Sequence, residues 1–351
     1  MLSDDLIVAE LTAGPPLLQV VVDTEEEFDW LQPFDQSQRS TRSLQAQPLA
    51  QDLFDPYRLK PVYVVDHPVA LAPEAGVLEN FFRSGRCLIG AHLHPWVNPP
   101  FEEPVNRFNS YPGNLSSALE QRKLESLTSA IAERFGSRPL LYKAGRYGVG
   151  PATAEILGSL GYLIDLSVVP HTDFRAEEGP DFRACPDRPY WFGPGLRLLE
   201  IPLSRGYWGS GLRYGARIVR ALQSPPNKVL GGFYARLRLM QRLTLTPEGV
   251  DTASHRRVVR AMLEAGHRVF TLTYHSPSLA PGHTPYVSNE QDLRVFLDRI
   301  KRLLAFFFEE LRGEPTTPLE IRQMALAARD PIRRAAVYRG PADRSGGSEY
   351  W

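Results

Sequence analysis

Three short segments rich in acidic and histidine residues each follow an apolar run typical of a buried strand. Asp23 and Glu25 follow the first run, His92 and His94 end the second, and His275 follows the third. Carboxylates and closely spaced imidazoles are ligands of divalent metal ions. A further histidine, which titrates near neutral pH, can serve as a proton donor. These residue types therefore indicate a metal-dependent hydrolase.

The spacing within the first two segments suits convergence on one ion. Asp23 and Glu25 lie two residues apart, and so do His92 and His94. Side chains two positions apart on an extended strand point to the same face of the sheet. A carboxylate with two histidines fits zinc by ligand type, and also cobalt or nickel. We therefore expect one divalent ion, most simply zinc.

The elements that must position these residues alternate between strands and helices. Strand-like apolar runs cover residues 17–22, 61–65, 87–91, 140–143, 162–167, 197–201 and 268–273. Helical spacing of apolar residues covers 119–135, 151–160, 252–265 and 289–311. This alternation predicts an α/β fold with a parallel sheet or barrel, in which active sites collect at the carboxyl ends of the strands.

The chain shows no internal repeat and no linker that would divide it. Because the site segments span residues 23 to 275, we predict one catalytic domain over residues 15–312, after an N-terminal segment 1–14. Residues 205–245, rich in Arg, Gly and Tyr, form a possible insertion or lid. For residues 313–351 we expect a C-terminal helix and a disordered tail with a polar run at 344–348.

The composition excludes several classes of protein. The 40 basic and 40 acidic residues cancel, which argues against nucleic acid as a partner. Cys87 and Cys185 are the only cysteines, so a Cys-based zinc cluster is impossible. No apolar stretch approaches the roughly 20 residues that span a bilayer. The acidic start of the chain is unlike a secretory signal, so we expect a cytoplasmic protein.

Four motifs in order resemble the polysaccharide deacetylase family, which has the NodB-homology domain of carbohydrate esterase family four. The motifs are VDTEEEFDW at 22–30, IGAHLHPW at 89–96, KAGRYG at 143–148, and HSPSL at 275–279 with TPY at 284–286. The resemblance covers residues 18 to 287 and is strongest for the WalW-like branch, which is associated with bacterial surface polysaccharides. It implies a single-domain, distorted (β/α) barrel of the NodB type with about seven parallel strands.

The resemblance also implies roles for the first two motifs and for His275. Asp23 would be the general base and Glu25 a metal ligand, although the family usually has adjacent aspartates here, which leaves the two roles interchangeable. His92 and His94 would complete the metal site, and His275 would be the general acid. The family usually spaces its two histidines four residues apart, which leaves Asp66 or His67 as alternatives to His94.

The third motif departs from the family at one position. Lys143 stands where the family has an arginine that pairs with the catalytic base, and lysine keeps the charge but loses the planar fork. Arg146 would supply a second cation or contact substrate, and the Tyr147 N–H would be an oxyanion donor. Asp173 lies where the family often has an aspartate that orients the acid histidine, and Asp165 competes for that role.

The resulting hypothesis is a hydrolase that removes an N-acetyl group from an amino sugar of a bacterial surface polysaccharide or its precursor. A cytoplasmic location favours a lipid-linked or nucleotide-linked precursor as the carbohydrate partner. Two alternatives remain open. One is a deacylase of a small amide or ester metabolite, and the other is a non-catalytic carbohydrate-binding relic, to which Lys143 in place of arginine lends weight.

Overall fold

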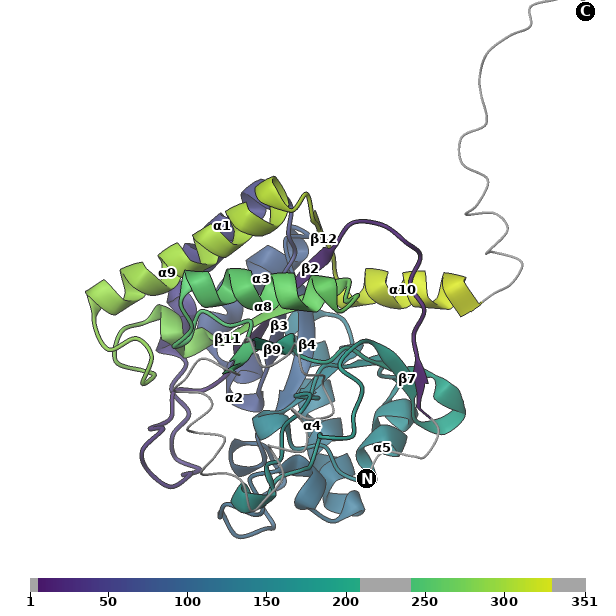
Figure 1. Cartoon of the computed structure of the whole chain (residues 1–351). Helices are drawn as coiled ribbons and strands as arrows, with labels where there is room; N and C mark the ends of the chain where they lie inside the picture. The colour runs from purple at the N-terminus through teal and green to yellow at the C-terminus, as the bar shows by residue number, and fades with distance from the viewer. Residues whose placement is uncertain (1–5, 209–240, 330–351) are drawn as a thin grey trace, which may run out of the picture.

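A curled, mainly parallel sheet forms the centre of the molecule (Figure 1). The computed structural model describes residues 6–208 and 241–329. The strand order is β1-β7-β8-β6-β5-β4-β3-β2-β11, with β12 also paired to β2, and all pairs from β8 to β11 are parallel. The seven strands of this parallel part are β2 (Leu17–Thr24), β3 (Val62–Val65), β4 (Leu88–Leu93), β5 (Leu141–Ala144), β6 (Ile164–Asp165), β8 (Leu198–Glu200) and β11 (Val269–His275).

These seven strands coincide with the seven predicted runs, so the predicted α/β fold is confirmed. The register places the candidate site residues at one edge of the sheet. Asp23 is paired with His275 across β2 and β11, and His92 is paired with Lys143 across β4 and β5. Because parallel strands end at the same edge, four residues far apart in sequence lie together there.

Irregular hydrogen bonds bring the two ends of the parallel sheet together. The Leu203 N–H donates to the Val168 carbonyl at 3.0 Å, and the Leu245 N–H donates to the Ser204 carbonyl at 2.9 Å. The Leu245 carbonyl in turn accepts from the Thr273 N–H of β11 at 3.2 Å. The sheet therefore curls into the predicted distorted barrel within a single domain. A separate antiparallel pair of strands, β9 (Arg205–Trp208) and β10 (Gln241–Thr244), lies at this junction.

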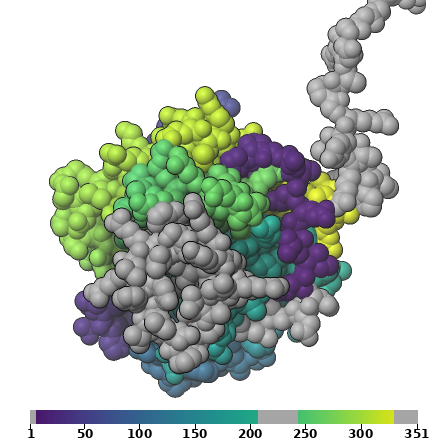
Figure 2. Space-filling model, viewed as in Figure 1, coloured from purple at the N-terminus to yellow at the C-terminus, as the bar shows by residue number. Residues whose placement is uncertain are grey.

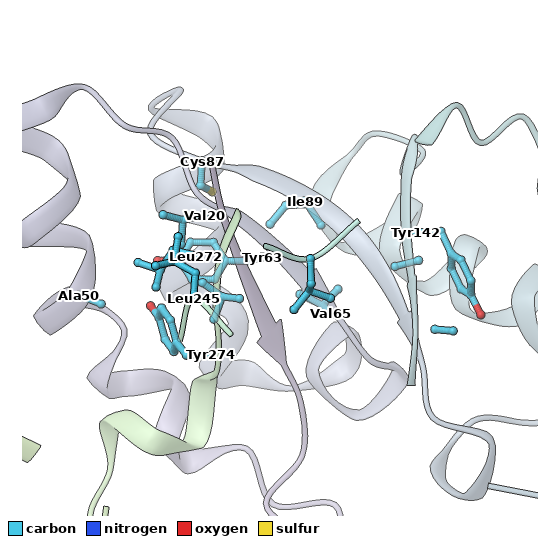
Figure 3. Packing of buried hydrophobic residues seen from close by; sticks show 14 of the residues in the cluster. Val20, Ala50, Tyr63, Val65, Cys87, Ile89, Tyr142, Leu245, Leu272 and Tyr274 are labelled. Atoms are coloured by element: carbon cyan, nitrogen blue, oxygen red, sulfur yellow. The ribbon is translucent and has the colours of Figure 1, made fainter. Parts of the chain in front are cut away.

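Helices cover the outer face of the sheet and form the larger apolar cluster with it. Figure 3 shows part of this cluster, in which Val20, Tyr63 and Leu272 from three strands pack beside Ala50. Burial of such side chains is the main stabilising term of the fold. The helices are α1 (Pro48–Phe54), α2 (His67–Leu71), α3 (Gly76–Arg83), α4 (Ser117–Phe135), α5 (Thr153–Leu160), α8 (Thr252–Glu264) and α9 (Glu290–Ala305).

The inner face of the sheet changes from apolar to charged along the strands. Because side chains alternate along β2, Leu17, Gln19, Val21 and Asp23 share one face. Leu17 and Val21 belong to a second apolar cluster, into which helix α10 (Pro318–Arg329) packs. Gln19 donates to the Thr271 hydroxyl at 2.8 Å, and Asp23 follows at the carboxyl end of the strand. The reactive groups therefore lie above a packed floor.

Elements outside residues 15–312 also pack against the sheet. β1 (Ile7–Val8) pairs with β7 (Tyr190–Phe192), where the purple N-terminal segment crosses the surface in Figure 2. β12 (Glu314–Pro315) pairs with β2 and leads into α10. The expected lid falls largely, and the expected disordered tail almost wholly, outside the described residues. Among the described residues, no helix combines the length and apolar character that crossing a membrane requires.

Candidate active site

A buried ion pair joins the first and third motifs. Lys143 Nζ lies 2.5 and 2.6 Å from the two carboxylate oxygens of Asp23, and it also donates to the Thr273 hydroxyl at 3.2 Å. Both side chains are almost fully buried. Burial raises the pKa of Asp23, but the charge and hydrogen bonds of Lys143, together with the charge of His275, outweigh it, so the pKa of Asp23 lies below its ordinary value. Asp23 is therefore held ionised.

His275 stands beside Asp23 and is held by a carboxylate that the sequence reasoning missed. His275 Nε2 lies 3.8 Å from Asp23 Oδ2, while its Nδ1 lies 2.9 Å from Glu248 Oε2. Glu248 also accepts from the His275 backbone N–H at 3.0 Å and from the Ser278 hydroxyl at 2.6 Å. Burial lowers the pKa of His275, but Glu248, Glu25 and Asp23 outweigh it and raise the pKa to about 10. His275 is thus protonated at neutral pH.

The prediction that Asp173 orients His275 is wrong. Asp173 forms ion pairs with Arg175 at 2.9 Å and Arg183 at 3.6 Å, in a short surface loop. Asp165, the competing residue, accepts from the Ser167 backbone N–H at 3.1 Å. Glu248 takes the orienting role because the loop after β10 brings it beside the end of β11.

Glu25, His92 and His94 form a buried group that could hold a metal ion. Glu25 Oε2 lies 3.6 Å from His92 Nε2 and 3.5 Å from His94 Nε2. The Glu25 N–H donates to the Ser276 hydroxyl at 3.2 Å, which fixes the start of this segment against the end of β11. The structure therefore joins His94, rather than Asp66 or His67, to Glu25 and His92.

The hydrogen bonds of the two imidazoles show that these residues suit a cation. His92 Nδ1 lies 2.9 Å from the Lys143 carbonyl, and His94 Nδ1 lies 2.8 Å from Glu26 Oε2. A carbonyl or carboxylate oxygen requires the hydrogen on Nδ1, so in a neutral ring the lone pair is on Nε2. Both Nε2 lone pairs then face Glu25, whose buried Oε1 has no hydrogen-bond partner in the described part of the chain.

Burial disfavours the charged forms of Glu25, His92 and His94, and a bound cation would stabilise the three side chains together. Burial lowers the pKa of His92 and lowers that of His94 to about 4, so both rings are neutral at pH 7. Burial also raises the pKa of Glu25 to about 7. Three acceptor atoms that converge without a donor among them repel one another. A divalent ion, or a proton, relieves that repulsion.

Arg146 and Tyr147 lie on a tight turn with left-handed backbone angles, φ 52° and 61°. Arg146 stacks on Tyr111, with its guanidinium carbon 4.1 Å from the ring centroid. It also donates to the Ser110 hydroxyl at 2.5 Å. The Tyr147 ring lies 5.3 Å from Lys143 Nζ. Of the expected cations, Lys143 contacts Asp23, whereas Arg146 contacts the loop around residue 110.

Aromatic side chains line one side of the site. Trp30 lies edge-on to His275, with ring centroids 4.8 Å apart, and also contacts Tyr286 at 5.9 Å. Phe28 stacks on Trp30 at 5.3 Å. These residues come from the loops that follow β2 and β11, so aromatic surface adjoins His275.

No protein-family model and no curated protein matches the sequence of the chain. Solved structures with a similar fold were found. A candidate glycoside hydrolase/deacetylase from Parabacteroides distasonis is similar over 90% of this chain and 71% of its own, with 10% identity and a TM-score of 0.53. A candidate polysaccharide deacetylase from Mycobacterium smegmatis is similar over 88% of this chain and 98% of its own, with 17% identity and a TM-score of 0.47. PuuE allantoinase is similar over 90% of this chain and 91% of its own, with 15% identity and a TM-score of 0.48.

The chain shares the fold of the Parabacteroides protein. At 10% identity the similarity establishes the distorted barrel and no activity. It does not identify the WalW-like branch, which stays a prediction. Any function must therefore be argued from the site.

Proposed function

We propose that this protein is a metal-dependent hydrolase that removes an N-acetyl group from an amino sugar of a surface polysaccharide or its precursor. One observation carries the proposal. Two neutral imidazoles and Glu25 converge beside the ionised Asp23, with the protonated His275 3.8 Å from that carboxylate. A base, an acid and a metal-binding group within one buried site are the components of amide hydrolysis.

Glu25, His92 and His94 would hold the ion, which when bound polarises a carbonyl and lowers the pKa of water. Asp23 accepts a proton from the attacking water, and Lys143 keeps Asp23 ionised and oriented. The Tyr147 backbone N–H is the proposed donor to the oxyanion that develops on the acetyl oxygen. His275 gives its proton to the departing amine nitrogen, so acetate and a free amino sugar leave. Glu248 stabilises the imidazolium that makes this possible.

The test is metal content together with acetate release. We expect about one zinc, cobalt or nickel ion per chain, with acetate released from N-acetylated sugars by the reconstituted protein. The panel should contain free, nucleotide-linked and lipid-linked sugars, oligosaccharides and small acyl amides and esters. His92→Ala removes one ligand and is expected to abolish both metal binding and acetate release. Activity on small amides or esters alone would replace the sugar substrate with a metabolite, and failure to bind any metal would favour a carbohydrate-binding relic.

The pH profile tests His275 and Glu248. Catalysis needs His275 protonated, so the rate falls as the pH rises through its pKa. Because Glu248 helps to raise that pKa to about 10, Glu248→Gln lowers the pKa and moves the alkaline limb of kcat/KM to lower pH. The exposed Glu264→Gln is the control and leaves the limb unchanged. An unaltered alkaline limb in Glu248→Gln would remove His275 from the role of general acid.

A further inference from the structure

We propose that Glu26 is a positioning residue that fixes the tautomer and orientation of His94, so that the His94 Nε2 lone pair faces the proposed ion. The inference rests on the metal site of the proposed function. The sequence reasoning gave Glu26 no role, because it is the middle member of an acidic run. In the structure it is a fully buried carboxylate whose two oxygens are each used.

The two oxygens of Glu26 accept hydrogen bonds from two different rings. Oε2 lies 2.8 Å from His94 Nδ1, and Oε1 accepts from the Trp96 indole N–H at 2.7 Å. The Trp96 indole can only donate, so Oε1 accepts, and with Oε2 also accepting, the His94 proton is held on Nδ1. Nε2 of the same ring is left bare at 3.5 Å from Glu25. A carboxylate placed in this way behind a metal-bound histidine orients the ligand and makes it more basic.

The backbone of Glu26 is fixed as well. Its N–H donates to Asp66 Oδ2 at 2.6 Å, while Asp66 Oδ1 accepts from the Val69 N–H at 2.7 Å and caps helix α2. Glu26, Asp66 and His94 could by their residue types hold a second ion. The carboxylate oxygens of Glu26 and Asp66 instead accept from N–H donors, so this group contacts His94 on its Nδ1 side, away from the proposed ion.

Packing restricts the His94 ring from two further directions. The Trp96 ring stacks on it with centroids 4.2 Å apart and planes inclined by 23°. A Cβ atom at Gly145 would lie 2.4 Å from His94 Cδ2, so only glycine fits beside the ring edge next to Nε2. These contacts hold the plane of the imidazole, and the hydrogen bond at Nδ1 determines which nitrogen carries the proton. Glu26 decides that choice.

Glu26→Gln is the informative substitution because an amide has one acceptor and one donor group. The Trp96 N–H cannot change, so the amide oxygen turns to Trp96 and its NH2 faces His94. His94 must then accept through Nδ1 and carry its proton on Nε2, where the ion would bind. We expect Zn²⁺ and Co²⁺ to bind about 10–100-fold more weakly than in the unaltered protein.

A double variant separates positioning from a general structural effect. In Trp96→Phe the indole donor is gone, so the glutamine of Glu26→Gln can turn its oxygen to His94 Nδ1. The double variant is therefore expected to bind Zn²⁺ more tightly than Glu26→Gln alone. Glu120→Gln is the matched control, because Glu120 is also a buried carboxylate that accepts from a hydroxyl, Thr153 at 2.5 Å. It should leave the Zn²⁺ affinity unchanged.

Nitrogen NMR of the metal-free protein gives a readout that needs neither metal nor activity. Two-bond ¹H–¹⁵N spectra should show His94 protonated on Nδ1 in the unaltered protein and on Nε2 in Glu26→Gln. An Nε2–H tautomer in the unaltered protein, or equal Zn²⁺ affinity in Glu26→Gln and Glu120→Gln, would overturn the inference. Metal binding without acetate release would defeat the proposed function alone, since tautomer and affinity are measured independently of turnover.

Discussion

Asp23→Asn is expected to reduce acetate release by about 10²–10⁴-fold, the usual contribution of a general base. An amide oxygen keeps one hydrogen bond from Lys143 but cannot take a proton from water. Because Asp23 contacts Lys143 and His275 rather than the histidine pair, the metal content should remain near one ion per chain. The measurement is kcat/KM for acetate release with metal content determined on the same sample.

Two comparisons sharpen this result. Asp165→Asn makes the same chemical change at another buried aspartate and should leave turnover nearly unchanged. Glu25→Gln should lose the metal and turnover together, since Glu25 lies 3.5 and 3.6 Å from the two imidazoles. If Asp23→Asn loses the metal while Glu25→Gln keeps it, the roles of base and ligand are exchanged. That alternative was open from the sequence, where the two residues differ only in position.

The fold could be predicted because its signals are local. Each of the seven parallel strands is an apolar run that can be recognised without its neighbours, and four of the helices show apolar residues at helical spacing. Strand ends then place Asp23, His92 and His275 at one edge, since parallel strands share a direction. Candidate site residues that lie at strand ends can therefore be predicted from the sequence.

The partners of these residues could not be predicted, because they depend on packing between segments distant in sequence. Glu248 reaches His275 across 27 positions through the loop after β10. No predicted strand lies next to Glu248, because residues 205–245 are predicted to be a possible insertion or lid. Asp173 stands at a position that matches a family pattern. In the structure, however, its carboxylate accepts a hydrogen bond from Arg175, two residues further along the chain. Glu26 lies between two other glutamates, and the sequence alone did not show which of the three faces the histidines.

Lys143→Met should give the largest loss of stability, about 3–5 kcal/mol of unfolding free energy, because it leaves Asp23 buried without its partner. The Asp23 and Lys143 side chains are 4% and 1% exposed, so water cannot replace the lost contact. The measurement is denaturant unfolding of the metal-free protein. Exposed Lys60→Met is the control for loss of one positive charge and should lie within about 0.5 kcal/mol of the unaltered protein.

The pH dependence of that loss identifies its cause. With Lys143 present the pKa of Asp23 is lowered, so the pair stabilises the fold above the ordinary pKa of an aspartate and loses this as the pH falls. In Lys143→Met, burial, the largest influence on Asp23, is opposed by His275 without the lysine and raises the pKa of Asp23, so the variant should become less stable as the pH rises from 4 to 8. Adding Asp23→Asn removes the buried charge and should recover most of the lost stability. A double variant as unstable as Lys143→Met would mean that lysine acts through packing, and the ion pair would not be what holds Asp23 ready as the base.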